Sequence, residues 1–255
     1  MERKIVRRSL LVSPTLTRRA WRVNRWSIFV IALATVLTAP FVVIVGSWLT
    51  PEAEVWQHLA TTVLGTYILN SFLLALGVGV GTFVIGTSTA WLVTMCKFPG
   101  RRVLEWALLL PMAIPAYILA YTYTDFLQVS GPVQSLIRDT FNLRPREYWF
   151  PDVRSLPGAI TMLTLALYPY VYLLARTAFL EGSTVLLEAA QSLRCHPWTS
   201  FLRVSLPLAR PAIAGGVALA LMEALSDFGT VDFFGVPTLT TGIYRTWFGM
   251  GERTA

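Results

Sequence analysis

Long runs of uncharged, apolar residues are the feature that most limits what this chain can fold into. Residues 26–50 and 59–96 contain no charged side chain, and a helix needs only about 20 apolar residues to cross a bilayer. Helices and closed barrels alone can cross, because every backbone polar group must be hydrogen-bonded there. We therefore expect an all-α integral membrane protein with about five spans: Trp26–Thr50, Leu59–Cys96 (an approach segment plus a span), Trp106–Thr124, Ser155–Ala175 and a fifth from Pro211.

Basic residues gather on alternate sides of these spans. The tail 1–25 holds eight Lys or Arg residues, and the short segment 97–102 holds three. The loop 176–210 has four basic and two acidic residues, whereas 51–57 has two acidic residues and no basic one. By the positive-inside rule, the N-terminal tail 1–25 and the loop 176–210 are both expected in the cytoplasm.

Several classes of function lack the residues that they need. The net charge of +7 is concentrated in the tail, beside a long apolar run, which favours contact with the lipid bilayer over nucleic acid. His58 and His196 are expected on opposite sides of the membrane, and neither HExxH nor a Walker A pattern occurs. Cys96 and Cys195 have no metal-ligand spacing. We expect no enzyme activity, no firm metal site and no cofactor on this chain.

Small and aromatic residues within the spans have simple structural interpretations. Gly77 and Gly81 form a GxxxG pair, which is typical of close helix packing in membranes. Tyr168 and Tyr172 lie one helical turn apart, and an aromatic belt at the membrane surface explains them better than metal ligation.

The segment from Glu188 to Pro207 has the strongest local pattern outside the spans. Its first part, Glu-Ala-Ala-Gln with flanking leucines, is rich in helix formers. Pro197 interrupts that part and suits the first turn of a second helix, which runs to Pro207. The residues alone leave two interpretations open: an amphipathic hairpin that merely caps the bundle, or a docking element.

This segment resembles the EAA loop of type I, binding-protein-dependent ABC importer permeases. The matching residues are Glu188, Ala189 and Ala190, with Leu206 and Pro207 at the end of the loop, and Arg194 replaces the usual glycine. The resemblance implies an incomplete permease domain over 64–255, in a bacterial inner membrane, with 176–210 as its cytoplasmic coupling loop. It also implies three partners: an ATP-hydrolysing ABC ATPase dimer that binds the loop, a periplasmic substrate-binding protein, and a second permease half.

The stretch 222–244 resembles ferric-iron permeases of the Fbp/Sfu type, while thiamine, polyamine and phosphonate permeases share the architecture. Fe³⁺ prefers oxygen ligands. Glu223 and Asp227 are four residues apart, so that one helix would place both on one face, and they are candidates for the substrate path. The alternative is that both carboxylates lie in the outer headgroup region, in contact with water or the binding protein.

The resembled iron permeases fuse two homologous halves, each with its own loop. This sequence has one loop and no internal repeat. We expect a chain truncated before the last helix of its half, with a separate polypeptide as the other explanation. A channel-like or structural membrane subunit is the alternative of another class.

Overall fold

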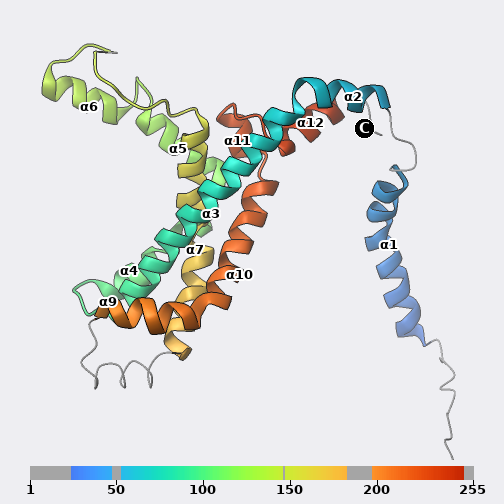
Figure 1. Ribbon diagram of the computed structural model, residues 1–255, viewed down its shortest axis with the longest axis horizontal. Helices are drawn as coiled ribbons and strands as arrows, with labels where there is room; N and C mark the ends of the chain where they lie inside the picture. Colours follow the sequence, from blue (N-terminus) through green and yellow to red (C-terminus); the bar gives the residue numbers. More distant parts are fainter. Residues whose placement is uncertain (1–23, 48–52, 146, 183–196, 250–255) are drawn as a thin grey trace, which may run out of the picture. The chain divides into compact units, whose positions relative to one another are not determined.

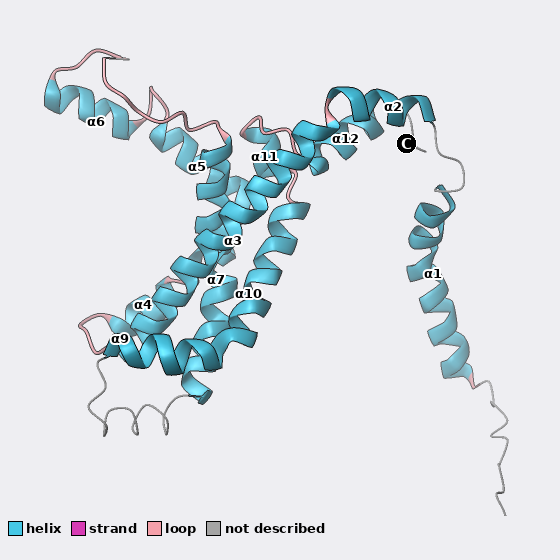
Figure 2. Ribbon diagram, in the orientation of Figure 1, coloured by secondary structure: helices cyan, strands magenta, loops and turns pink. Residues whose placement is uncertain are grey.

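The computed structural model describes residues 24–47, 53–145, 147–182 and 197–249 (Figure 1). Within these ranges every regular element is helical (Figure 2). Four of the described helices are long and apolar enough to cross a membrane, or five if one sharply bent pair counts as a span. The expected all-α membrane fold is therefore confirmed. The chain divides into two compact units, and the division falls near residue 51 of the sequence.

Helix α1 (Arg25–Ser47) makes up the described part of the first unit. It is apolar throughout, and all of its described side chains are exposed. Pro40 lies inside the helix, which continues through it. Because lipid is the solvent that suits such a surface, α1 matches the first expected span.

Three long helices form the core of the second unit: α3 (Leu64–Met95), α7 (Leu156–Gly182) and α10 (Leu206–Ser226). Figure 1 shows them side by side. The most apolar stretch of α7 is 61% buried, compared with 22% in α3 and 28% in the helical run that contains α10. Helix α7 is therefore the central helix of the bundle.

Glycines allow α3 and α10 to approach α7 closely. A Cβ atom at Gly77 or Gly81 would overlap side chains of α7, at 2.7 Å and 2.6 Å. Gly86 and Gly216 both lie against Val171 of α7. A Cβ at Gly86 would be 2.6 Å from Val171 Cβ, and a Cβ at Gly216 would be 2.8 Å from Val171 Cα. The expected packing role of Gly77 and Gly81 is confirmed, since no larger residue fits at these contacts.

The third expected span, Trp106–Thr124, is not one straight helix. It is divided into α4 (Arg101–Ala107), the 3-10 turn η1 (Leu110–Ala113) and α5 (Ala116–Leu127), followed by α6 (Pro132–Phe141). The two halves, 101–113 and 116–141, are bent by 101°. Pro111 and Pro115 lack the N–H groups that would continue the helix, which explains the break.

The fifth helix begins well before Pro211, where we expected it to start. One helical run extends over Trp198–Ser226 and joins α9 (Pro197–Ser200), the π-helical turn η2 (Phe201–Ser205) and α10. In η2 the Leu206 N–H donates to the Phe201 carbonyl, five residues back. This wider turn lets the chain pass Pro207, which has no N–H to donate, without a break.

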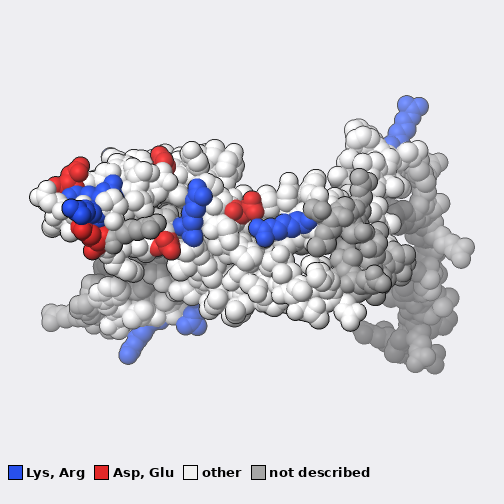
Figure 3. Space-filling model, turned by 90° about the horizontal axis from the view of Figure 1, so that it is seen from above, with Lys and Arg blue, Asp and Glu red and all other residues white. Residues whose placement is uncertain are grey.

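The two ends of the bundle differ in their elements. One end, here the α4/α9 end, holds α4 and α9. The opposite end, the α2/α12 end, holds α2 (Ala53–Thr62), α6, α11 (Gly229–Phe233) and α12 (Leu239–Gly249) (Figure 1). Helix α2 precedes α3, but it begins at Ala53, six residues ahead of the approach segment expected from Leu59. Seen from above, acidic and basic side chains are interspersed over the part of the α2/α12 end that contains α6 (Figure 3).

Candidate functional site

The two helices that flank the candidate coupling segment in the sequence, α7 and α9, have their adjoining ends at the α4/α9 end (Figure 1). Glu188, Ala189, Ala190 and Arg194 fall outside the described residues. The structure has helix at both ends of the expected loop 176–210, because α7 extends to Gly182 and a new helix starts at Pro197. The start of a helix at Pro197 is as expected.

Aromatic rings attach the helix that follows this segment to the bundle. Phe201 is 9% exposed, and its ring centroid lies 4.7 Å from that of Trp91 in α3. The ring centroids of Trp91 and Phe179, a residue of α7, are 5.8 Å apart. Leu206 packs against the same buried cluster. Pro207 is in the first turn of α10 and does not end a loop. The helical run that begins at Pro197 is therefore packed against both α3 and α7.

A second feature is a cavity of about 230 Å³ beside the break in the third span. Glu223 of α10 and Tyr170 of α7 supply its polar side chains. The remaining walls are apolar and include both prolines of the break: Pro111, Met112, Ala113, Ile114, Pro115, Ala116, Ala166 and Leu167. Within the described ranges, no Lys or Arg forms an ion pair with the Glu223 carboxylate.

Glu223 lies level with the middle of the bundle. Leu221, two residues earlier, packs on Gly79, where a Cβ would be 3.3 Å from Leu221 Cδ2. Gly79 is halfway along the 32-residue helix α3, and Tyr170 is near the centre of the 27-residue helix α7. Glu223 is thus three residues from the end of α10, yet level with the centres of α3 and α7.

Asp227 lies one turn beyond Glu223, where its backbone N–H donates to the Glu223 carbonyl at 3.0 Å, but it does not line the cavity that Glu223 borders. The Asp227 carboxylate instead accepts hydrogen bonds from the backbone N–H groups of Thr230 (2.8 Å) and Val231 (3.3 Å), and so caps α11. Burial raises the pKa of Asp227, although these hydrogen bonds oppose the shift. Its local role is to hold the turn between α10 and α11.

Tyr168 and Tyr172 are buried, at 7% and 0% exposure, so the expected aromatic belt is wrong. Each hydroxyl donates to a backbone carbonyl of the broken third span: Tyr168 to Leu108 and Tyr172 to Glu105. Sequence analysis missed this role. The two prolines of the break were the available signal, because carbonyls freed by proline need donors from other helices.

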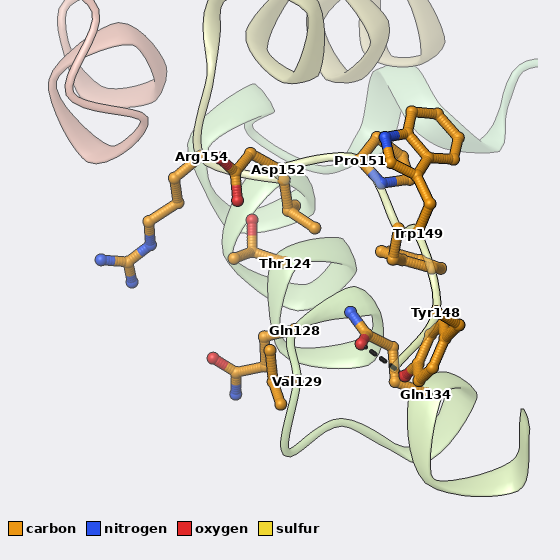
Figure 4. Close-up of a pocket in the computed structure, with 11 residues that line it drawn as sticks. Thr124, Gln128, Val129, Gln134, Tyr148, Trp149, Pro151, Asp152 and Arg154 are labelled. Carbon is orange, nitrogen blue, oxygen red and sulfur yellow. Dashed lines mark hydrogen bonds between the residues drawn. The ribbon is translucent and has the colours of Figure 1, made fainter. Parts of the chain in front are cut away.

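A pocket at the α2/α12 end is shown in Figure 4. It has a volume of about 460 Å³ and lies between α5, α6 and the segment 148–154. The Tyr148 hydroxyl donates to the Gln134 side chain at 2.7 Å, and Gln134 in turn donates to the Leu127 carbonyl. Trp149 is 87% exposed beside it. The pocket therefore has both polar and apolar walls, and the large Trp149 ring among them is exposed.

Clustered metal ligands are absent from the part of the chain that the structure describes: no group of three or more His, Cys, Asp or Glu residues could hold an ion there. Glu223 is therefore a single carboxylate on a cavity wall.

The sequence model for binding-protein-dependent transport system inner membrane components matches residues 82–247. The chain belongs to this family. The match begins inside α3 and ends inside α12, so it includes the coupling segment, the cavity at Glu223 and the broken third span. The resemblance of the EAA loop to this class of permease is thereby confirmed at the level of the family.

Relatives of this inner membrane component carry names with different substrates. The sulfate permease protein CysT of Escherichia coli is 28% identical over 185 residues, which cover 71% of this chain and 62% of CysT. The molybdenum permease protein ModB of Escherichia coli is 31% identical over 150 residues, 58% of this chain and 62% of ModB. The Fe(3+) permease protein FbpB 2 of Haemophilus influenzae is 28% identical over 178 residues, 70% of this chain and 31% of FbpB 2.

The chain spans about three fifths of the length of CysT and ModB, and about a third of FbpB 2. A solved bacterial ABC transporter involved in the import of alginate matches it with a TM-score of 0.70 at 17% identity, over 90% of this chain and 86% of that one. This likeness shows a shared fold. Ferric iron is one of several substrates named among the relatives.

Proposed function

We propose that this chain is a permease subunit of an ATP-driven ABC importer, without enzyme activity of its own. The observation that supports this most strongly is that the family match includes both the EAA-type segment and a cavity bordered by Glu223, a carboxylate with which no described Lys or Arg forms an ion pair. The segment lies between the ends of α7 and α10, two of the three core helices. Closure of an ATPase against it therefore moves the helices that line the cavity.

The α4/α9 end faces the cytoplasm in this proposal, and the N-terminus lies on the same side of a bacterial inner membrane. The basic residues Lys97, Arg101 and Arg102 at this end support that orientation. An ABC ATPase dimer binds here and supplies the bound ATP. A periplasmic binding protein docks at the opposite, α2/α12 end, where the pocket beside Trp149 opens, and a second permease half completes the path.

Replacing Glu188 with lysine tests ATPase docking. Charge reversal in the docking segment places a like or unpaired charge in the contact, so we expect at least about a tenfold loss of ATPase that co-purifies with the permease. The measurement is pull-down of the cognate ATPase from membranes that hold the complete complex. Asp139→Lys, on an exposed position of α6 at the opposite, α2/α12 end, is the matched charge reversal and should keep the ATPase. Equal recovery with both variants would refute docking at Glu188.

Ferric iron is the substrate that the cavity favours among those named for relatives. Sulfate and molybdate are anions, and an unpaired carboxylate at this depth repels them, whereas Fe³⁺ prefers oxygen ligands such as carboxylate and phenolate. Glu223 and Tyr170 offer one of each. Thiamine and polyamines are cations that the same carboxylate would also accept, and phosphonate would be repelled.

Uptake by an iron-starved host that lacks other iron importers separates these substrates. With the complete transporter, radiolabelled ferric iron should accumulate, and excess sulfate, molybdate or thiamine should not compete. Accumulation of sulfate or molybdate in place of iron would overturn the ferric assignment and leave the permease assignment in place. The matching deletion strain is the control.

A further inference from the structure

Three side chains on one face of α7 hold the first half of the broken third span. Tyr168, Tyr172 and Arg176 are spaced four residues apart, so they share a helix face. Each contacts the segment 101–113, which contains α4 and η1. We call these three residues the α7 ladder.

The two tyrosines bind carbonyls that the break leaves without helical donors. In an α-helix, the Leu108 carbonyl would accept from Met112 N–H, but that N–H donates to Leu109 at 3.1 Å. The Tyr168 hydroxyl replaces it at 2.9 Å. In the same way, Leu109 N–H donates to Trp106, and the Tyr172 hydroxyl donates to the Glu105 carbonyl at 3.0 Å.

Arg176 continues the ladder one turn further along α7. Its guanidinium forms an ion pair with the Glu105 side chain, and both side chains are about three quarters buried. Glu105 thus contacts α7 through its carbonyl and its carboxylate. Because unpaired polar groups are costly in lipid, these contacts hold α4 and η1 against α7.

We propose that Tyr168, Tyr172 and Arg176 are positioning residues that make α7 and the segment 101–113 move as one body during transport. The proposal rests on the proposed permease function. The segment 183–196 follows directly on α7, and the other end of 101–113 contributes Pro111 and Ala113 to the wall of the Glu223 cavity. The ladder therefore carries a displacement from the ATPase contact to the substrate path.

The bend of the third span separates two halves that contact α7 in different ways. Ile114 is extended and Pro115 precedes the first turn of α5, so the two halves of the span have no continuous helix between them. The half before the bend is held to α7 by the polar contacts of the ladder, whereas α5 packs against α7 through apolar side chains such as the buried Ala120.

The double variant Tyr168→Phe and Tyr172→Phe removes two hydroxyls and keeps both rings. In the purified permease, hydrogen–deuterium exchange of 101–113 should rise. In proteoliposomes with the complete transporter, substrate imported per ATP hydrolysed should fall about fivefold while ATPase binding is unchanged. Tyr121→Phe is the matched control, because Tyr121 is 62% exposed and its ring packs on Phe233. Wild-type exchange and wild-type coupling in the double variant would overturn the proposal.

A cross-link supplies a second measurement if the double variant folds poorly. In a background without Cys96 and Cys195, Glu105→Cys and Arg176→Cys are joined by a short bifunctional thiol reagent. If the two elements move as one body, the joined protein imports at the rate of the same variant before joining. Loss of import on joining would overturn the proposal. A wild-type transporter that does not bind the ATPase would instead count against the proposed function, and the exchange measurement on the permease alone would still decide the ladder.

Discussion

Gly216→Val is expected to remove most of the folded permease from the membrane. A Cβ at Gly216 would be 2.8 Å from Val171 Cα and 3.1 Å from the Tyr170 carbonyl oxygen, so the new side chain meets backbone that cannot rotate away. Overpacking of this kind costs about 3 kcal/mol or more when backbone must shift. The measurement is the thermal midpoint of the purified protein, together with its yield of monodisperse material.

Gly215→Val is the matched control for this substitution. Gly215 is the neighbouring residue of the same helix, but the nearest atom to a Cβ there is Leu174 Cδ1, at an ordinary contact distance of 3.9 Å. Its effect should stay within about 1 kcal/mol. If both variants lowered the midpoint equally, helix propensity and not the approach of α10 to α7 would be the cause.

Glu223→Gln is expected to lower ferric iron uptake at least about tenfold, the scale on which losing a metal-orienting group acts. Glu223 is an exposed residue, and no described Lys or Arg forms an ion pair with its carboxylate. The fold should therefore survive, with an unchanged thermal midpoint. Initial uptake rates of radiolabelled iron at matched expression provide the measurement.

Two comparisons make the result at Glu223 specific. Asp139→Asn removes an exposed carboxylate from α6, far along the chain from the cavity, and should leave uptake unchanged. Glu223→Asp keeps the charge and should retain part of the uptake. An increase in sulfate or molybdate uptake by Glu223→Gln would identify an oxyanion substrate, because the substitution removes a repulsive charge. Unchanged uptake of every substrate would place Glu223 off the path.

Local sequence determined the membrane-spanning class, most of the spans and the packing role of Gly77 and Gly81. Hydropathy is a property of neighbouring residues, and the thickness of the bilayer sets the length of a spanning helix. These features can therefore be predicted without knowledge of the tertiary contacts. The helix that begins at Pro197 was predictable for the same reason, since proline restricts its own backbone and that of the residue before it. The EAA-type segment was recognisable because its residues are contiguous.

Only the tertiary structure decided what the polar groups inside the bundle do. Tyr168 and Tyr172 looked like surface aromatics, yet their partners are carbonyls 60 and 67 residues away. Asp227 lies one turn beyond Glu223, as the spacing predicts, but only the structure shows that its carboxylate accepts backbone hydrogen bonds from Thr230 and Val231. The depth of Glu223 depends on Leu221 packing against Gly79 of another helix. A polar group inside a membrane protein needs a hydrogen-bond partner. The sequence shows which groups need one, but the packing of the helices determines which partner each group has.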